Sequence, residues 1–211
     1  MPHVTACHDR AMARPKDQTK RRDQLVAATA TAVLQRGSTE MRLTDIAQEA
    51  GLSPASVLYY YPDVQELFMA VFAQGGRQYC EQRESRVAEE STPWARLRAC
   101  IHSGIPWPGP AEEASRILYE LMPIVLRNET AATRYHELIV RQAVLYQRVL
   151  EECEASGQFR LLMPPEVLAR SFVALEDGYG VEVLTGATTP EEEEAWLLHY
   201  AQTVVLPTTA S

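Results

Sequence analysis

The stretch "TDIAQEAGLSPASVLYYYPDVQEL", from Thr44 to Leu67, decides the fold of the N-terminal part of this chain. Apolar residues recur at helical spacing and end at Gly51, which favours a short helix followed by a turn. Ser53 can then cap a second helix, with Pro54 at its first position. That helix must end before Pro62. The apolar set of the first helix is Leu43, Ile46, Ala47 and Ala50. Two short helices joined by a tight glycine turn are typical of a helix-turn-helix.

The same periodicity extends in both directions from this motif. A helix is expected over about 20–36, ended by Gly37, and a long helix after Asp63, which forms a capping-box pattern with Glu66. Further helical segments are expected near 93–103, 112–127, 129–155, 165–185 and 190–205. Strand patterns are nearly absent. The sequence therefore predicts an all-α fold of about nine helices.

Composition narrows the class of protein. The 211 residues suffice for one or two domains, and there is no apolar run of membrane-spanning length and no secretory signal. The four cysteines have no CxxC pair, so a reduced cytoplasm is the expected setting. The five histidines have no metal-ligand spacing, and GxSxG, P-loop and GxGxxG motifs are missing. We expect no enzyme activity, no cofactor and no metal site.

The charge is unevenly distributed. The chain carries a net charge of −8, yet residues 1–75 hold eight basic and eight acidic side chains and are neutral overall. Both lysines lie in a basic stretch at 10–22, which consists of Arg10, Arg14, Lys16, Lys20, Arg21 and Arg22 against Asp17. This pattern predicts a flexible basic arm over 1–18 that contacts a polyanion. A solvated tail without a partner explains the charge equally well.

The spacing from the first helix through "LTDIAQEAGLSPASVLYYYP" resembles the DNA-binding domain of TetR-type (tetracycline-repressor-like) regulators, over roughly residues 20–72. The resemblance implies a DNA-binding domain at 19–72 and a ligand-binding and dimerisation domain at 73–211. It also implies a homodimer formed through the helices at about 165–185 and 190–205. The expected partners are a double-stranded DNA operator and an unidentified small-molecule effector, in a bacterial cytoplasm and without a membrane.

The resemblance places the second helix of the motif in the major groove of DNA. Tyr61 is expected in the core and Tyr60 at a phosphate, while Ala55 and Ser56 are expected at base edges. The complete set of expected DNA contacts is Lys20, Arg21, Arg22, Arg42, Thr44, Ser53, Pro54, Ala55, Ser56, Tyr59 and Tyr60. Three positions depart from the family pattern, namely Leu58, Val64 and Arg42, and Val64 replaces a lysine that meets phosphate. Weaker anchoring, offset by the basic arm, is expected.

The C-terminal part carries weaker signals. "ALEDGYGVEVLTG" (174–186) weakly resembles the end of choline-responsive repressors. Aromatic walls with carboxylates suggest a pocket for a cation, although residues of these types at helical spacing are more often core. The candidate pocket residues are Trp107, Arg116, Tyr119, Glu120, Met122, Tyr146, Phe172, Glu176 and Tyr179.

The sequence thus favours a homodimeric repressor that releases a palindromic operator when a small molecule binds. A helix-turn-helix fold used to contact a protein partner remains an alternative, as does an activator of the same fold.

Overall fold

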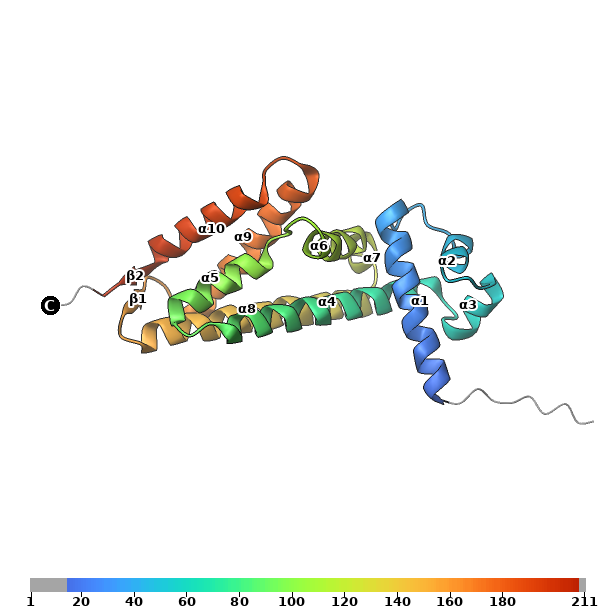
Figure 1. The fold of residues 1–211 in the computed structure, drawn as a ribbon, viewed down its shortest axis with the longest axis horizontal. Helices are drawn as coiled ribbons and strands as arrows, with labels where there is room; N and C mark the ends of the chain where they lie inside the picture. Colours follow the sequence, from blue (N-terminus) through green and yellow to red (C-terminus); the bar gives the residue numbers. More distant parts are fainter. Residues whose placement is uncertain (1–14, 209–211) are drawn as a thin grey trace, which may run out of the picture.

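The computed structural model describes residues 15–208, in which the chain forms ten helices and a two-stranded ribbon (Figure 1). The helices are α1 (Pro15–Arg36), α2 (Leu43–Glu49), α3 (Pro54–Tyr60), α4 (Val64–Glu89), α5 (Pro93–Gly104), α6 (Pro110–Glu120), α7 (Met122–Val125), α8 (Glu129–Ala155), α9 (Pro165–Thr185) and α10 (Pro190–Val204). The all-α prediction is confirmed.

The boundaries differ from the expected ones in two places. Helix α1 begins at Pro15 rather than near 20, so the last four residues of the expected arm are helical. The first fourteen residues of that arm, with Arg10 and Arg14, lie outside the described residues. The expected helix at 112–127 divides into α6 and α7 at Leu121, because Pro123 lacks the amide hydrogen that a continuous helix needs.

The ribbon was not expected. Strands β1 (Phe159–Leu161) and β2 (Val205–Pro207) pair antiparallel, with Arg160 opposite Leu206. Three-residue strands are too short to give a period-two pattern in the sequence.

Side-chain caps fix several helix starts. Ser53, Thr92 and Asn128 accept a backbone N–H in the first turn of α3, α5 and α8, respectively. Asp63 accepts the amide hydrogen of Gln65 at 2.9 Å and so begins α4. These caps satisfy amide groups that otherwise have no partner at a helix start.

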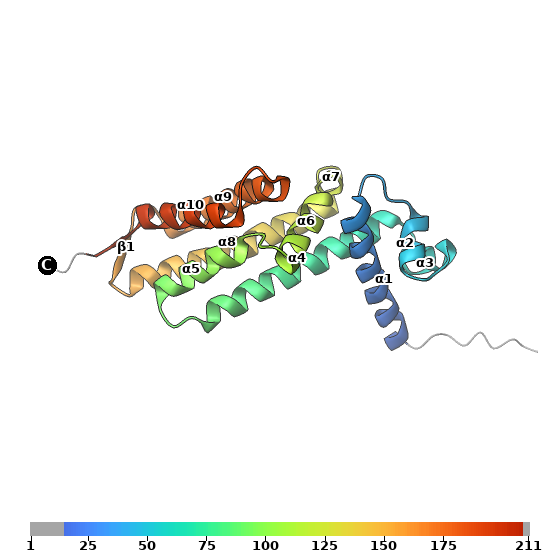
Figure 2. The same cartoon turned by 45° about the horizontal axis from the view of Figure 1, so that its top comes forward.

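The elongated molecule has the short helices α2 and α3, with α1, at one end and the ribbon at the other (Figure 1, Figure 2). Its buried side chains form two clusters. The N-terminal core includes Ile46, Val57 and Phe72 and continues through α7 to Leu138 in α8. The C-terminal core is built from α5, α8, α9 and α10, and includes Phe172.

No helix in the described part of the chain combines the length and the hydropathy of a membrane-spanning segment. Cys80, Cys100 and Cys153 are buried free thiols, and burial raises the pKa of Cys100 to about 12. Cys7 lies outside the described residues.

Candidate functional site

The helix-turn-helix is formed by α2, the turn at Gly51 and α3. Gly51 has a φ of 64°, a conformation that favours glycine. Ser53 caps α3 by accepting the Ser56 amide hydrogen at 3.2 Å, and the hydroxyl oxygens of Ser53 and Ser56 lie 2.8 Å apart. Val57 is buried, whereas Pro54 and Ala55 are exposed. Helix α3 therefore packs through one face and presents its first turn outward.

The three tyrosines occupy different environments. Tyr61 is buried in the N-terminal core, as expected, with the Arg22 guanidinium 5.2 Å from its ring centroid. Tyr59 is 71% exposed. Tyr60 is half-buried, packs against the N-terminal core and meets the Tyr59 ring edge-to-face at 5.1 Å. Tyr60 thus has a packing role beside any contact through its hydroxyl.

Basic side chains lie on the same end of the molecule. Lys20, Arg21 and Arg22 are exposed on α1, and Arg42 is exposed at the N-cap of α2 next to exposed Thr44. Arg36 pairs instead with Asp45 at 2.7 Å. The half-buried Val64 packs against the N-terminal core.

A junction joins α6 to the end of α1. Ser38 donates its hydroxyl hydrogen to the main-chain oxygen of Glu120. The Ser38 amide donates to Glu120 Oε2 at 3.3 Å. Gly37 has a φ of 73°, and a Cβ there would lie 3.1 Å from the same carboxylate oxygen. Glu120, the last residue of α6, is therefore hydrogen-bonded to the segment that follows α1.

A cavity of about 50 Å³ lies where the two cores meet. Phe72 and Leu138 of the N-terminal core line it, as does Ile139 of the C-terminal core. Its remaining lining residues are Tyr79, Gly104, Pro106, Ser115, Leu118, Tyr119, Met122, Tyr135, Gln142, Glu176, Asp177 and Gly180. The two charged residues that line it, Glu176 and Asp177, are both acidic.

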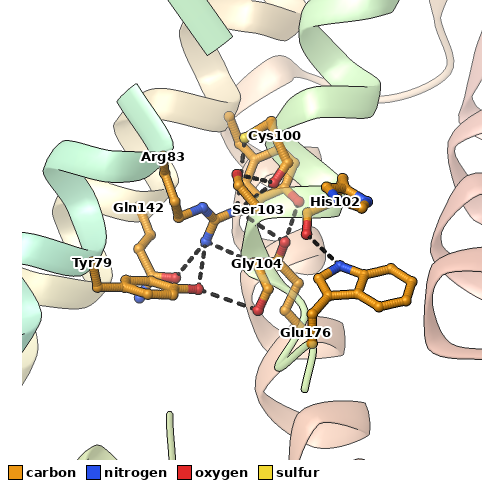
Figure 3. Close-up of polar contacts among 10 residues, drawn as sticks. Tyr79, Arg83, Cys100, His102, Ser103, Gly104, Gln142 and Glu176 are labelled. Atoms are coloured by element: carbon orange, nitrogen blue, oxygen red, sulfur yellow. Dashed lines mark hydrogen bonds and ion pairs between the residues drawn. The ribbon is translucent and has the colours of Figure 1, made fainter. Parts of the chain in front are cut away.

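Beside this cavity, Arg83 and Glu176 form a buried ion pair (Figure 3). Their side chains are 1% and 3% exposed. The guanidinium donates to both carboxylate oxygens, at 2.9 and 3.1 Å. It also donates to Gln142 at 2.9 Å and to the main-chain oxygen of Cys100 at 2.8 Å. Burial, the largest single influence, lowers the pKa of Arg83, but Glu176 together with Tyr79, Cys100 and Tyr146 outweighs it, and the pKa lies well above its usual range.

Two further groups complete this cluster. Tyr146 donates its hydroxyl hydrogen to Glu176 Oε1. Gly104 leaves the room that the carboxylate occupies, because a Cβ there would lie 2.9 Å from Glu176 Oε2 and closer still to Oε1. The pair is therefore enclosed by α4, α5, α8 and α9, which carry Arg83, Gly104, Tyr146 and Glu176.

Three of the nine candidate pocket residues, Tyr119, Met122 and Glu176, line this cavity. Tyr146 and Phe172 stack on each other at 4.9 Å behind it, within the C-terminal core.

The other four candidates lie elsewhere. Trp107 donates its ring N–H to the main-chain oxygen of His102, and Arg116 pairs with Glu112 one turn earlier. Glu120 belongs to the junction with α1. Tyr179 packs on Trp196. Helical periodicity cannot tell which face of a helix meets a cavity rather than a neighbouring helix.

Several residues in or beside the cavity were not predicted from the sequence. Tyr79 and Arg83 lie one turn apart on α4, beyond the motif, where no pattern singled them out. Asp177 follows Glu176 directly in "LEDGYG", and this pair of adjacent acids was the available signal. Tyr135 had no signal of its own.

Comparison with known proteins gives consistent results. No family model matches the chain. The HTH-type regulator YfiR of Bacillus subtilis, itself uncharacterized, is 21% identical over 182 residues, which cover 83% of this chain and 84% of YfiR. The HTH-type regulator BetI of Brucella canis is 31% identical over 81 residues, but that match spans 38% of this chain and 41% of BetI.

Solved structures are similar over most of the chain. A putative transcriptional regulator from Saccharomonospora viridis, crystallised in complex with choline, gives a TM-score of 0.83 at 19% identity and covers 89% of this chain and 99% of that one. A putative TetR-family regulator from a Rhodococcus species gives 0.77 at 23% identity, with coverage of 88% and 98%. The chain described here therefore has the fold of the TetR-type transcriptional regulators.

Proposed function

We propose that the protein is a ligand-responsive DNA-binding transcriptional regulator and acts as a homodimeric repressor in a bacterial cytoplasm. The observation that carries this proposal is the helix-turn-helix at the free end of the molecule. Its second helix is capped by Ser53, anchored by buried Val57 and Tyr61, and presents exposed Ala55 and Tyr59. In a helix-turn-helix, the N-terminal residues of that helix contact base edges.

The expected DNA contacts divide into two kinds. We assign Pro54, Ala55, Ser56 and Tyr59 on α3 to contacts with base edges. Ser56 already shares a hydrogen bond with Ser53, so a base or phosphate that it contacts must join or replace that bond. We propose that the flanking phosphates are contacted by the remaining residues, namely Lys20, Arg21 and Arg22 on α1, Arg42 and Thr44 at α2, Ser53, and the Tyr60 hydroxyl.

A dimer is proposed through α9 and α10. Val167 and Val181 on α9 and Trp196 on α10 are large apolar side chains that are 45%, 43% and 42% exposed. Covering them in a dimer removes apolar surface from water. Two recognition helices also need a dimer in order to meet half-sites about 34–36 Å apart.

We propose that ligand binding and DNA binding weaken each other, and that α6 connects the two sites. Tyr119 lines the cavity and donates to the main-chain oxygen of Asp177 at 2.9 Å, while the next residue, Glu120, binds Ser38 at the end of α1. A ligand that displaces Tyr119 therefore moves the residue that holds the DNA-binding end. The coupling must be reciprocal, so DNA weakens ligand binding by the factor by which ligand weakens DNA binding.

The effector is proposed to be an organic cation. The charged side chains that line the cavity are acidic, and aromatic rings accompany them. A regulator of the same fold was crystallised with choline. No catalytic role is proposed for any residue.

The first experiment is selection from a random DNA duplex pool, read by sequencing, for the wild type and two variants. Tyr59→Ala removes an exposed side chain without disturbing the core. Tyr60→Phe keeps the packed ring and removes only the hydroxyl. We expect a palindromic site, a relaxed sequence preference for Tyr59→Ala, and weaker binding with unchanged preference for Tyr60→Phe.

The salt dependence of the selected site separates this function from the alternative of a protein-binding module. Each phosphate contact contributes about −0.9 to the slope of log K against log salt. A slope near zero, or no enriched site at low salt, would argue for a protein partner. Glu154→Gln, an exposed change near the C-terminal end of α8 and outside both α3 and the proposed dimer helices, serves as the control and should bind as the wild type does.

A further inference from the structure

The two carboxylates of the cavity differ in what they already bind. Glu176 receives two hydrogen bonds from Arg83 and one from Tyr146, so its negative charge is neutralised inside the protein. The Arg83 carbon Cζ also lies 5.3 Å from the Tyr79 ring centroid and 5.4 Å from that of Tyr146. Carboxylate and aromatic faces together form the environment that binds organic cations. Arg83 is thus the cationic partner of Glu176 within the protein itself.

Asp177 has no such partner. It forms no salt bridge with any residue of the described chain and is half-buried beside the cavity. Burial raises the pKa of Asp177, whereas Arg83 and Arg170 at longer range and a hydrogen bond with Tyr135 act to lower it. The cavity therefore has one carboxylate whose charge a ligand can still neutralise.

The walls around Asp177 suit an alkylated cation. Tyr79, Tyr119, Tyr135 and Phe72 are aromatic, and each of them lines the cavity. Tyr119 is held in place by its hydrogen bond to the main chain of Asp177. Aromatic faces attract a methylated ammonium group without requiring hydrogen bonds from it.

The size of the cavity limits the ligand. Its volume is about 50 Å³, against roughly 10–15 Å³ for a single water molecule on the same measure. Only a compact head group can enter, and only if flexible lining side chains such as Met122 and Leu118 move aside. A second positive charge on the ligand would find no free acid, because Glu176 is occupied.

We propose that Asp177, and not Glu176, is the counter-ion of a compact organic cation that carries a single positive charge, and that Arg83 permanently occupies Glu176. This inference rests on the proposed function in one respect, namely that the cavity is the effector site. Beyond the proposed function, it specifies the charge and the size of the ligand and the residue that binds its charge.

The test is calorimetric titration of the full-length protein with two probes. One is choline, and the other is its neutral carbon isostere, in which a tert-butyl group replaces the trimethylammonium group. We expect wild type to bind choline at least about tenfold more tightly than the isostere. Asp177→Asn should weaken choline binding by about 30-fold or more, as when one partner of a buried charge pair is removed, and should abolish the preference.

Two further variants make the test specific. Asp177→Glu keeps the negative charge and should retain the preference for choline. Glu182→Gln removes an exposed carboxylate from the same helix and should change neither affinity. Thermal unfolding of each variant establishes that it is folded.

Three results would overturn the inference: equal affinity of wild type for both probes, undiminished choline binding by Asp177→Asn, or no choline binding by wild type. Operator binding is measured on the same preparations without ligand. Operator binding without choline binding refutes this inference alone. Choline binding that depends on Asp177, without operator binding, refutes the proposed regulator and leaves the inference standing.

Discussion

Replacing Glu193 should stabilise the protein, and the gain should depend on pH. Glu193 lies on the inner face of α10 with 0% of its surface exposed. Both of its carboxylate oxygens are buried, and neither has a hydrogen-bond partner in the described chain. A charged carboxylate without a partner is very costly in such a place. Burial, with a smaller contribution from Glu176, therefore raises the pKa of Glu193 to about 8.

The sign and size of the effect follow from this pKa. The unfolded chain releases the proton near pH 4.5, the ordinary value for this group, but the folded chain holds it until about pH 8. The stability associated with Glu193 is therefore fully present below pH 4.5 and is lost as the pH rises towards 8. One pH unit corresponds to about 1.4 kcal/mol, so the loss at pH 7 reaches at most roughly 3 kcal/mol.

Glu193→Gln has nearly the same shape and no titration. We expect wild type and variant to differ little near pH 4.5 and the variant to be more stable by about 2–3 kcal/mol at pH 7. Urea unfolding followed by circular dichroism, at one fixed protein concentration, measures the difference at each pH.

Glu191→Gln is the matched control. Glu191 lies in the same first turn of α10 but is exposed. The helix dipole favours its carboxylate, so this change should cost a little stability. A difference between Glu193→Gln and wild type that is the same at pH 5 and pH 8 would mean that Glu193 is not desolvated, and the reasoning would be refuted.

Three further changes test other contacts. Arg83→Met leaves Glu176 buried and unpaired and should destabilise the protein by about 3–5 kcal/mol in urea unfolding; a loss under 1 kcal/mol would mean that water replaces the guanidinium. Gly104→Ala places a methyl group where the Glu176 carboxylate lies and should lower the free energy of unfolding by about 1–3 kcal/mol. Gly75→Ala is the control, because its added Cβ would lie 3.9 Å from the nearest atom, and it should be neutral or stabilising. Trp196→Arg should convert a dimer into a folded monomer in light scattering; an unchanged mass would place the interface elsewhere.

The sequence predicted the two helices of the helix-turn-helix well because local chemistry determines them. Gly51, Ser53, Pro54 and Pro62 specify turns and helix ends through their own backbone and side-chain properties. The structure places α2 and α3 at Leu43–Glu49 and Pro54–Tyr60, as these residues require. Tyr61 was expected in the core, and it is buried one turn after the buried Val57.

The candidate cavity was predicted only in part because it depends on contacts between distant helices. Arg83 and Glu176 are 93 positions apart, and no local pattern relates them. Gly104 carries no turn or cap; its role is to leave room for Glu176, and only the packed structure reveals that role. The sequence indicated aromatic and acidic residues in this domain, but not which of them share one cavity.

Three acids in the C-terminal part, two buried and one half-buried, are costly to remove from water. Arg83 neutralises the charge of Glu176, and Glu193 stays neutral because it retains its proton. Asp177 forms no salt bridge in the described chain. A cation at Asp177 would supply the missing charge, and a ligand that binds only the folded state stabilises it by mass action. Saturating choline should therefore raise the melting temperature of wild type and have no such effect on Asp177→Asn. An equal rise in both proteins would mean that choline acts elsewhere, and the unpaired acid would then need another explanation.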